Sequence, residues 1–145
     1  MVEVRHVRPG DEPTWRSLWR DYLAFYETRL PEDVYRNTFA RLVDPEVRDC
    51  WGLLAVVEGV DVGLAHCITH RHGWRIDDVC YLQDLYVSPL RRSAGAGRAL
   101  IEAVYAEADA RGCGDVYWLT QTFNEPARRL YDRVAAATPF IRYRR

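Results

Sequence analysis

The chain has 145 residues, of which 48% are hydrophobic and 28% charged, and its formal net charge is −1. This length suits a hydrophobic core of one domain, and we expect a single domain over 1–145. Proteins that bind nucleic acids usually carry an excess of positive charge, which this chain does not have, so no nucleic-acid partner is expected. No apolar run is long enough to span a bilayer and no signal-peptide pattern is present, so we expect no membrane association and a cytoplasmic location.

The N-terminal half predicts a strand, two helices and a β-hairpin. Residues 2–8 alternate apolar and polar side chains, which is typical of a strand. An amphipathic helix is predicted over about 11–26 and a second over about 32–42, with a proline break between them. Two strands at 53–57 and 62–70, joined by a Glu-Gly turn, then form the hairpin.

The C-terminal half alternates strands and helices. A strand over 81–87 precedes a helix that starts at about Arg98, and a second strand covers 115–121. Asn124 is predicted to cap a short helix, and 140–143 to close the sheet as a last strand. This order of elements predicts an α/β fold, with a mixed sheet flanked by helices.

A loop of small residues joins the strand at 81–87 to the following helix. Gly95 and Gly97 allow positive φ or a close approach of a ligand to the backbone. The first N–H groups of a helix attract anions, and Arg92 and Arg98 add charged donors. The loop therefore predicts a phosphate site, although an ordinary strand–turn–helix corner is an alternative. Its residues are Arg92, Ser93, Ala94, Gly95, Ala96, Gly97 and Arg98.

Three blocks of the sequence together resemble the GCN5-related N-acetyltransferases (GNAT family). The pattern Arg92-x-x-Gly95-x-Gly97 is similar to the acetyl-CoA pyrophosphate loop of that family. The run 81–87 resembles the Tyr-Leu-Glu-Asp strand of the diamine and polyamine/histone acetyltransferase branch, and 124–131 resembles its second cofactor segment. The resemblance implies a GNAT-like acyl-CoA N-acyltransferase fold, with a mostly antiparallel central sheet and a splayed parallel strand pair.

The resemblance also implies where acetyl-CoA, the acetyl donor, would bind. Its pantetheine arm would lie between strands 81–87 and 115–121 and pair with the open edge of the first. No metal is expected, because the histidines and cysteines show no ligand spacing. Beyond the phosphate loop, the implied contacts are Leu85, Tyr86, Val87, Asn124, Ala127 and Tyr131.

Acetyl transfer to an amine needs a group that removes a proton and a group that supplies one. An alkylammonium has a pKa near ~10.4, so reaching the free amine at neutral pH costs roughly 4–5 kcal/mol. Tyr131 lies on the inward face of its predicted helix and matches the family's general acid for the departing thiolate; a plain core tyrosine is the alternative. Gln83 replaces the usual glutamate and cannot take a proton, although it could hold water or the amine. Strand alternation puts Asp84 on the opposite face, where we interpret it as structural.

Tyr26 and Glu27 resemble the pair with which diamine acetyltransferases contact a cationic acceptor. With Gln83 they form the predicted acceptor contacts, although a solvated helix end explains the charge equally well. The acceptor is left open among polyamines, lysine side chains and other small amines, and proton removal through water to a distant carboxylate is also open. A non-catalytic acyl-CoA sensor is the alternative function, and a homodimer is implied by the resemblance alone.

Overall fold

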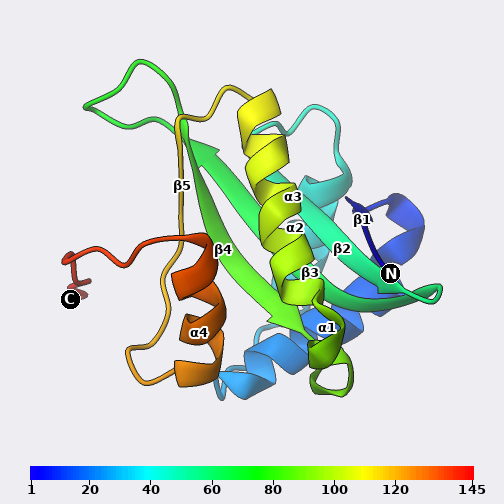
Figure 1. Ribbon diagram of the computed structural model, residues 1–145. Coiled ribbons are helices and arrows are strands. Elements are labelled where there is room, and N and C mark those ends of the chain that lie inside the picture. Colours follow the sequence, from blue (N-terminus) through cyan, green and yellow to red (C-terminus); the bar gives the residue numbers. More distant parts are fainter.

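The computed structural model describes residues 1–145 apart from the side chain of Ser93, and it shows one mixed sheet between two layers of helices (Figure 1). Neighbouring strands are antiparallel except for β4 and β5, which are parallel. The predicted mixed sheet is therefore confirmed. In spatial order the strands are β1 (Val2–His6), β2 (Cys50–Val57), β3 (Val60–His70), β4 (Val79–Val87) and β5 (Asp115–Tyr117).

Two helices pack on each face of the sheet. Helices α1 (Glu12–Phe25) and α2 (Glu32–Val43) bury a cluster around Trp15, which is 0% exposed. Helices α3 (Ala96–Ala110) and α4 (Glu125–Val134) bury a second cluster around Leu100. Burying one such large side chain contributes about 1.5–3 kcal/mol, so both clusters hold the sheet in place between the helices.

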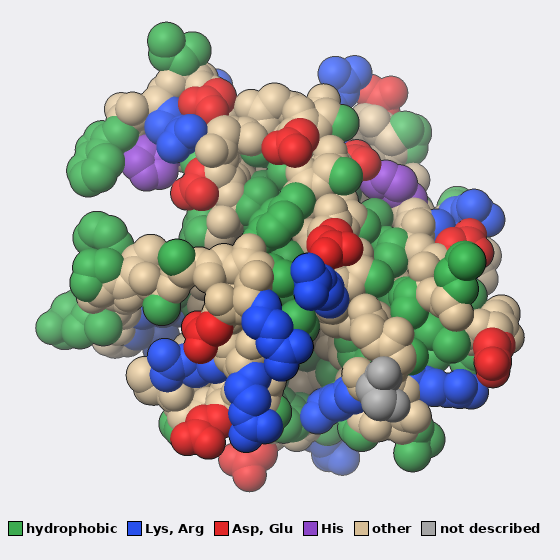
Figure 2. Space-filling view, viewed as in Figure 1, with side chains coloured by type: hydrophobic (Ala, Val, Ile, Leu, Met, Phe, Trp, Pro, Cys, Tyr) green, Lys and Arg blue, Asp and Glu red, His purple; other side chains and the backbone are tan. Residues whose placement is uncertain are grey.

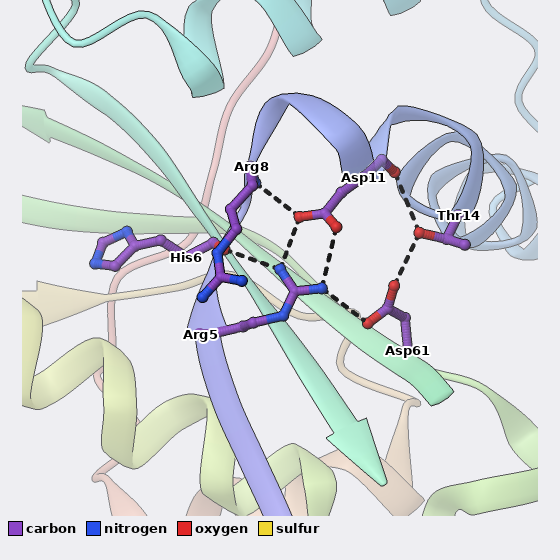
Figure 3. Close-up of polar contacts among 6 residues, drawn as sticks. All are labelled: Arg5, His6, Arg8, Asp11, Thr14 and Asp61. Carbon is purple, nitrogen blue, oxygen red and sulfur yellow. Dashed lines mark hydrogen bonds and ion pairs between the residues drawn. The ribbon is translucent and has the colours of Figure 1, made fainter. Parts of the chain in front are cut away.

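Arg5 joins β1, the start of α1 and β3 through side-chain contacts (Figure 3). Its guanidinium donates to the Asp11 carboxylate over 2.7 and 3.0 Å and to Asp61 over 3.4 Å. Thr14 of α1 donates to the same Asp61 carboxylate over 2.8 Å. The backbone N–H of Arg8 donates to Asp11 over 2.7 Å. These contacts hold the N-terminal end of α1 against the sheet and so help to set the direction of the helix.

Several boundaries differ from the sequence prediction by a few residues, and one predicted strand is absent. Helix α3 begins at Ala96 rather than Arg98, because Gly95 turns the chain into the helix with a φ of 80°. Strand β5 ends at Tyr117, four residues before the predicted 121. The predicted strand at 140–143 is wrong, because those residues form no strand and Phe140 is 83% exposed. A strand needs a neighbour to pair with, and local apolar residues cannot provide one.

No described helix is both long and apolar enough to cross a bilayer.

Candidate active site

Strands β4 and β5 pair over a short length and then separate. Three residue pairs join them, from Val79 with Asp115 to Tyr81 with Tyr117. The rings of Tyr81 and Tyr117 stack 4.9 Å apart and close the paired end. His70 of β3 also lies 2.7 Å from the Tyr117 hydroxyl through its Nε2. Beyond Tyr81, the β4 edge facing β5 has no ladder partner among the described residues, as predicted for a splayed strand pair.

The open end of this strand pair is where the predicted cofactor contacts of β4 lie. Leu85 and Val87 pack toward α3, whereas Tyr86 packs in the cluster beneath α1. Helix α4 lies at the open end, where the chain runs away from β4 after β5 (Figure 1). The backbone groups of β4 between these layers can therefore hydrogen-bond a bound amide.

The loop after β4 leads into the N-terminus of α3. The first intrahelical bond there runs from the Ala99 N–H to the Gly95 carbonyl over 3.0 Å, so the N–H groups of residues 96–98 precede the helical ladder. Arg92 donates from Nε to the Val87 carbonyl over 3.2 Å. Arg98 donates from Nε to Glu102 over 2.8 Å, so its charge is partly balanced. Arginine side chains surround this corner of the molecule, and the helix end is suited to an anion (Figure 2).

The other predicted loop residues have different surroundings. Ala94 is exposed at the end of a short 3₁₀ helix (Pro89–Ala94), whereas Ala96 is buried in the core. The side chain of Ser93 lies outside the described residues. A Cβ added at Gly97 would lie 3.2 Å from Leu130 Cδ2, so this glycine also allows α4 to pack closely.

Asn124 stands immediately before α4, as predicted. Its side chain forms no cap hydrogen bond, and its amide instead lies 3.5 Å from the Thr120 hydroxyl. The amide is therefore not engaged by its own helix. Ala127, one turn into α4, is half-buried.

A β-bulge in β4 changes the direction of Gln83 and Asp84. His66 of β3 is opposite Asp84, and the next residue, Cys67, is opposite Leu82, which leaves Gln83 without a partner on β3. Leu82 and Leu85 both pack toward α3, although strict alternation would put them on opposite faces. Gln83 is exposed, and Asp84 is buried on the α1 side. The bulge, rather than simple alternation, gives Asp84 its position.

Tyr131 of α4 interacts through charge with Tyr22 of α1 and with Tyr26 just after it, although the two helices pack on opposite faces of the sheet. Its ring contacts Trp118 with centroids 5.3 Å apart. Burial raises the pKa of Tyr131 to about 12, and the neighbouring Tyr26 adds to the effect. The pKa of Tyr22 is raised mainly by burial, and the Tyr131 phenol makes a smaller contribution to that shift. The Tyr22 and Tyr26 rings pack together with centroids 5.1 Å apart, and charge interactions link both phenols to Tyr131.

Tyr26 and Glu27, the predicted acceptor contacts, follow directly after α1 in a turn. Burial and the charge of Asp84 raise the pKa of Tyr26, which places this phenol near the buried carboxylate. Glu27 is exposed and has a φ of 53°, the left-handed conformation that glycine usually takes at a helix end. Such a position is strained for a glutamate and is more frequent at functional sites.

His66 is a site residue that the sequence reasoning missed. It is 6% exposed and lies between Trp15 and Asp84, 2.8 Å from each through its two ring nitrogens. The missed signal was the pair of tryptophans on the apolar face of the first predicted helix, because a buried indole N–H needs an acceptor. Among the described residues, no three His, Cys, Asp or Glu side chains come together as a metal site.

Known proteins are similar to this chain over almost its whole length. The D-amino-acid N-acetyltransferase HPA3 of Saccharomyces cerevisiae is 41% identical over 146 residues, which cover 99% of this chain and 90% of the relative. The aminoglycoside acetyltransferase AAC(6')-Iy, solved with a bisubstrate analogue, has a TM-score of 0.86 at 19% identity and covers 100% of this chain and 97% of its own. The ribosomal-protein-alanine N-acetyltransferase of Brucella melitensis has a TM-score of 0.81 at 22% identity, with 99% and 96% covered.

The two solved structures show the same fold, which confirms the predicted GNAT-like architecture. The sequence profile described as "Acetyltransferase (GNAT) family" matches residues 13–136. The chain therefore belongs to the GNAT family and is an N-acetyltransferase.

Proposed function

We propose that this chain, acting as one domain, moves the acetyl group of acetyl-CoA to a small primary amine by direct attack in a ternary complex. The observation that carries the proposal is the open end of the β4–β5 pair, where a strand edge without a ladder partner leads into the N-terminus of α3 and α4 carries the half-buried Tyr131. The strand edge and the helix N-terminus suit the donor, and the Tyr131 phenol suits the leaving thiolate.

The donor would bind along β4 and at the start of α3. The open edge from Leu85 to Val87 would hydrogen-bond the pantetheine amides, and the Asn124 side chain could add a contact. The N–H groups at residues 96–98 and the Arg92 guanidinium would hold the pyrophosphate. Solved GNAT relatives include an enzyme in complex with CoA, which supports this choice of donor.

Tyr131 would protonate the thiolate that leaves when the amide forms. With a pKa raised to about 12 by burial, its phenol stays protonated at neutral pH and can donate. Trp118 holds the ring from the side. Gln83 at the bulge is exposed and can hold water or the incoming amine, but it cannot act as a base.

Two acceptor classes have support. The named activity of the 41% identical yeast relative favours the α-amino group of a D-amino acid. The Tyr26-Glu27 pair, with the glutamate in a strained turn, favours a cationic amine such as a polyamine. Both classes present a primary amine. Homodimer formation and a cytoplasmic location stay predictions.

The test is free-thiol release from acetyl-CoA with a panel of amines: D- and L-amino acids, spermidine, putrescine, a lysine peptide and ethylamine. Tyr131→Phe should lower kcat about 10²- to 10⁴-fold on the best acceptor, while the acetyl-CoA Kd changes little. The matched control is Tyr35→Phe, a buried tyrosine beside Trp15 and Trp19. Tight acetyl-CoA binding without release on any amine would favour the sensor function instead.

A further inference from the structure

Asp84 is a buried carboxylate held by neutral donors. It is 8% exposed, and the Trp19 indole N–H donates to its Oδ2 over 3.2 Å. His66 Nδ1 lies 2.8 Å from the same oxygen. Because both contacts end on Oδ2, a proton can be taken up at Oδ1 while both stay intact.

The third member of this group, Trp15, determines the protonation of His66. Its indole N–H lies 2.8 Å from His66 Nε2, and an indole can only donate. Nε2 must therefore carry a lone pair, so the ring proton is on Nδ1 and is donated to Asp84. The imidazole is neutral in this arrangement and does not neutralise the carboxylate.

Among the described side chains, no arginine balances the charge of Asp84. Among those side chains, the one basic group within 4 Å of this carboxylate is the imidazole of His66, which is neutral in this arrangement. A buried charge without a counter-charge is costly, and an apolar residue would pack here at lower cost. The arrangement therefore points to a role for the carboxylate beyond packing.

Tyr22 of α1 connects Asp84 to the candidate active site. Trp19, one helical turn before Tyr22 on α1, donates to Asp84, and the Tyr22 ring packs edge-on against Tyr86, two residues after Asp84 on β4, with centroids 6.1 Å apart. Tyr22 therefore lies on the same side of β4 as this carboxylate.

Burial raises the pKa of Tyr22 far above its usual value, and the charge of Asp84 adds to the effect. The ring of Tyr22 packs against that of Tyr26 with centroids 5.1 Å apart. The other titratable groups that face Asp84 are His66 from β3, Tyr81 from β4 itself and Tyr26 after α1.

We propose that Asp84 is the terminal acceptor of the amine proton, reached through the Tyr22 hydroxyl, and that it replaces the glutamate absent at Gln83. The proposal rests on the proposed function. As the ammonium N–H passes its proton to the Tyr22 oxygen, the Tyr22 O–H passes its own to Asp84 Oδ1, so Tyr22 stays neutral.

The free amine then attacks the thioester carbonyl, forms the C–N bond and breaks the C–S bond. Tyr131 gives its proton to the thiolate and regains one from the nitrogen of the new amide. Asp84 returns its proton to solvent through Tyr22 after the products leave. In the overall reaction the ammonium nitrogen loses two protons: one goes to solvent through Asp84, and the other goes to the CoA thiolate through Tyr131.

The experiment compares acceptors that differ in amine pKa but little in shape: D-alanine with D-trifluoroalanine, and ethylamine with trifluoroethylamine. The fluorinated amines are largely neutral at the assay pH and need no proton acceptor. Asp84→Asn keeps an oxygen for Trp19 and His66. It should lower kcat/KM about 100-fold or more on the unfluorinated amine, but only about threefold on the fluorinated one.

Tyr22→Phe should show the same dependence on amine pKa, whereas Tyr35→Phe in the same apolar cluster should show none. If kcat/KM in both Asp84→Asn and Tyr22→Phe falls equally on the two amines of a pair, or does not fall at all, this proposal is overturned. The proposed function would still stand in that case. Wild-type protein that acetylates no amine would overturn the proposed function and this proposal with it.

Discussion

Two aspartates, each in contact with a different half of α1, lie in opposite electrostatic surroundings. Asp11, just before the helix, receives two bonds from the Arg5 guanidinium, at 2.7 and 3.0 Å. Asp84 contacts the C-terminal half of the helix and receives its bonds from neutral groups, the indole of Trp19 and the imidazole of His66.

The difference separates a structural carboxylate from the one that we propose to be reactive. The hydrogen bonds and charge of Arg5 lower the pKa of Asp11, so this group stays ionised and holds the helix to the sheet. Asp84 can take a proton without breaking an ion pair to an arginine. The start of α1 is thus held to the sheet by the Asp11 carboxylate, which Arg5 neutralises. The C-terminal half of α1 contacts the Asp84 carboxylate, which no arginine neutralises among the described side chains.

The largest effect is expected from His66→Leu, which should destabilise the protein by about 3 kcal/mol. The change leaves the Trp15 N–H without an acceptor and removes a donor from a buried carboxylate. Urea unfolding measures the loss, and His72→Leu in the exposed loop before β4 is the control. A loss no larger than that of the control would mean that the Asp84 group is not held as tightly as its geometry indicates.

Arg5→Leu should have a smaller effect, about 1–2 kcal/mol at pH 7, because its contacts are partly open to solvent. The folded-state pKa of Asp11 lies below its unfolded value near 4, so its contribution is fully present above about pH 4. It is lost as the pH falls through the lower folded-state value. The stability difference between wild type and variant should therefore shrink in acid, and a pH-independent difference would contradict this role.

The smallest change is expected from Glu27→Gly at the end of α1. Relief of the left-handed strain should stabilise the fold by up to about 1 kcal/mol. If Glu27 contacts a cationic acceptor, KM for that amine should rise at the same time. Glu58→Gly is the matched control, since Glu58 has a φ of 51° in the β2–β3 turn. Glu58→Gly should give the same gain in stability with no change in KM. If KM is the same in Glu27→Gly and Glu58→Gly, Glu27 is not part of the acceptor site.

Much of the fold was predictable because its signals are local. Alternating side chains, the Glu58-Gly59 turn and the Gly95 corner are readable within a few residues, and each predicted helix is present. The motif around Gly95 and Gly97 also indicated the family, which the comparisons confirm. The diamine branch that the strand at 81–87 suggested stays a prediction, because the 41% identical yeast relative is named for D-amino acids.

The sequence by itself determined the order of the elements, the family and the loop that leads into α3, since these depend on neighbouring residues. Only the tertiary structure decided that β5 leaves β4 after Tyr117 and that 140–143 forms no strand, because pairing depends on distant segments. The same holds for Asp84: a bulge in β4 turns it toward a histidine 18 residues away and a tryptophan 65 residues away. No local pattern encodes that meeting, because burial and hydrogen-bond partners are set by how the sheet and α1 pack together.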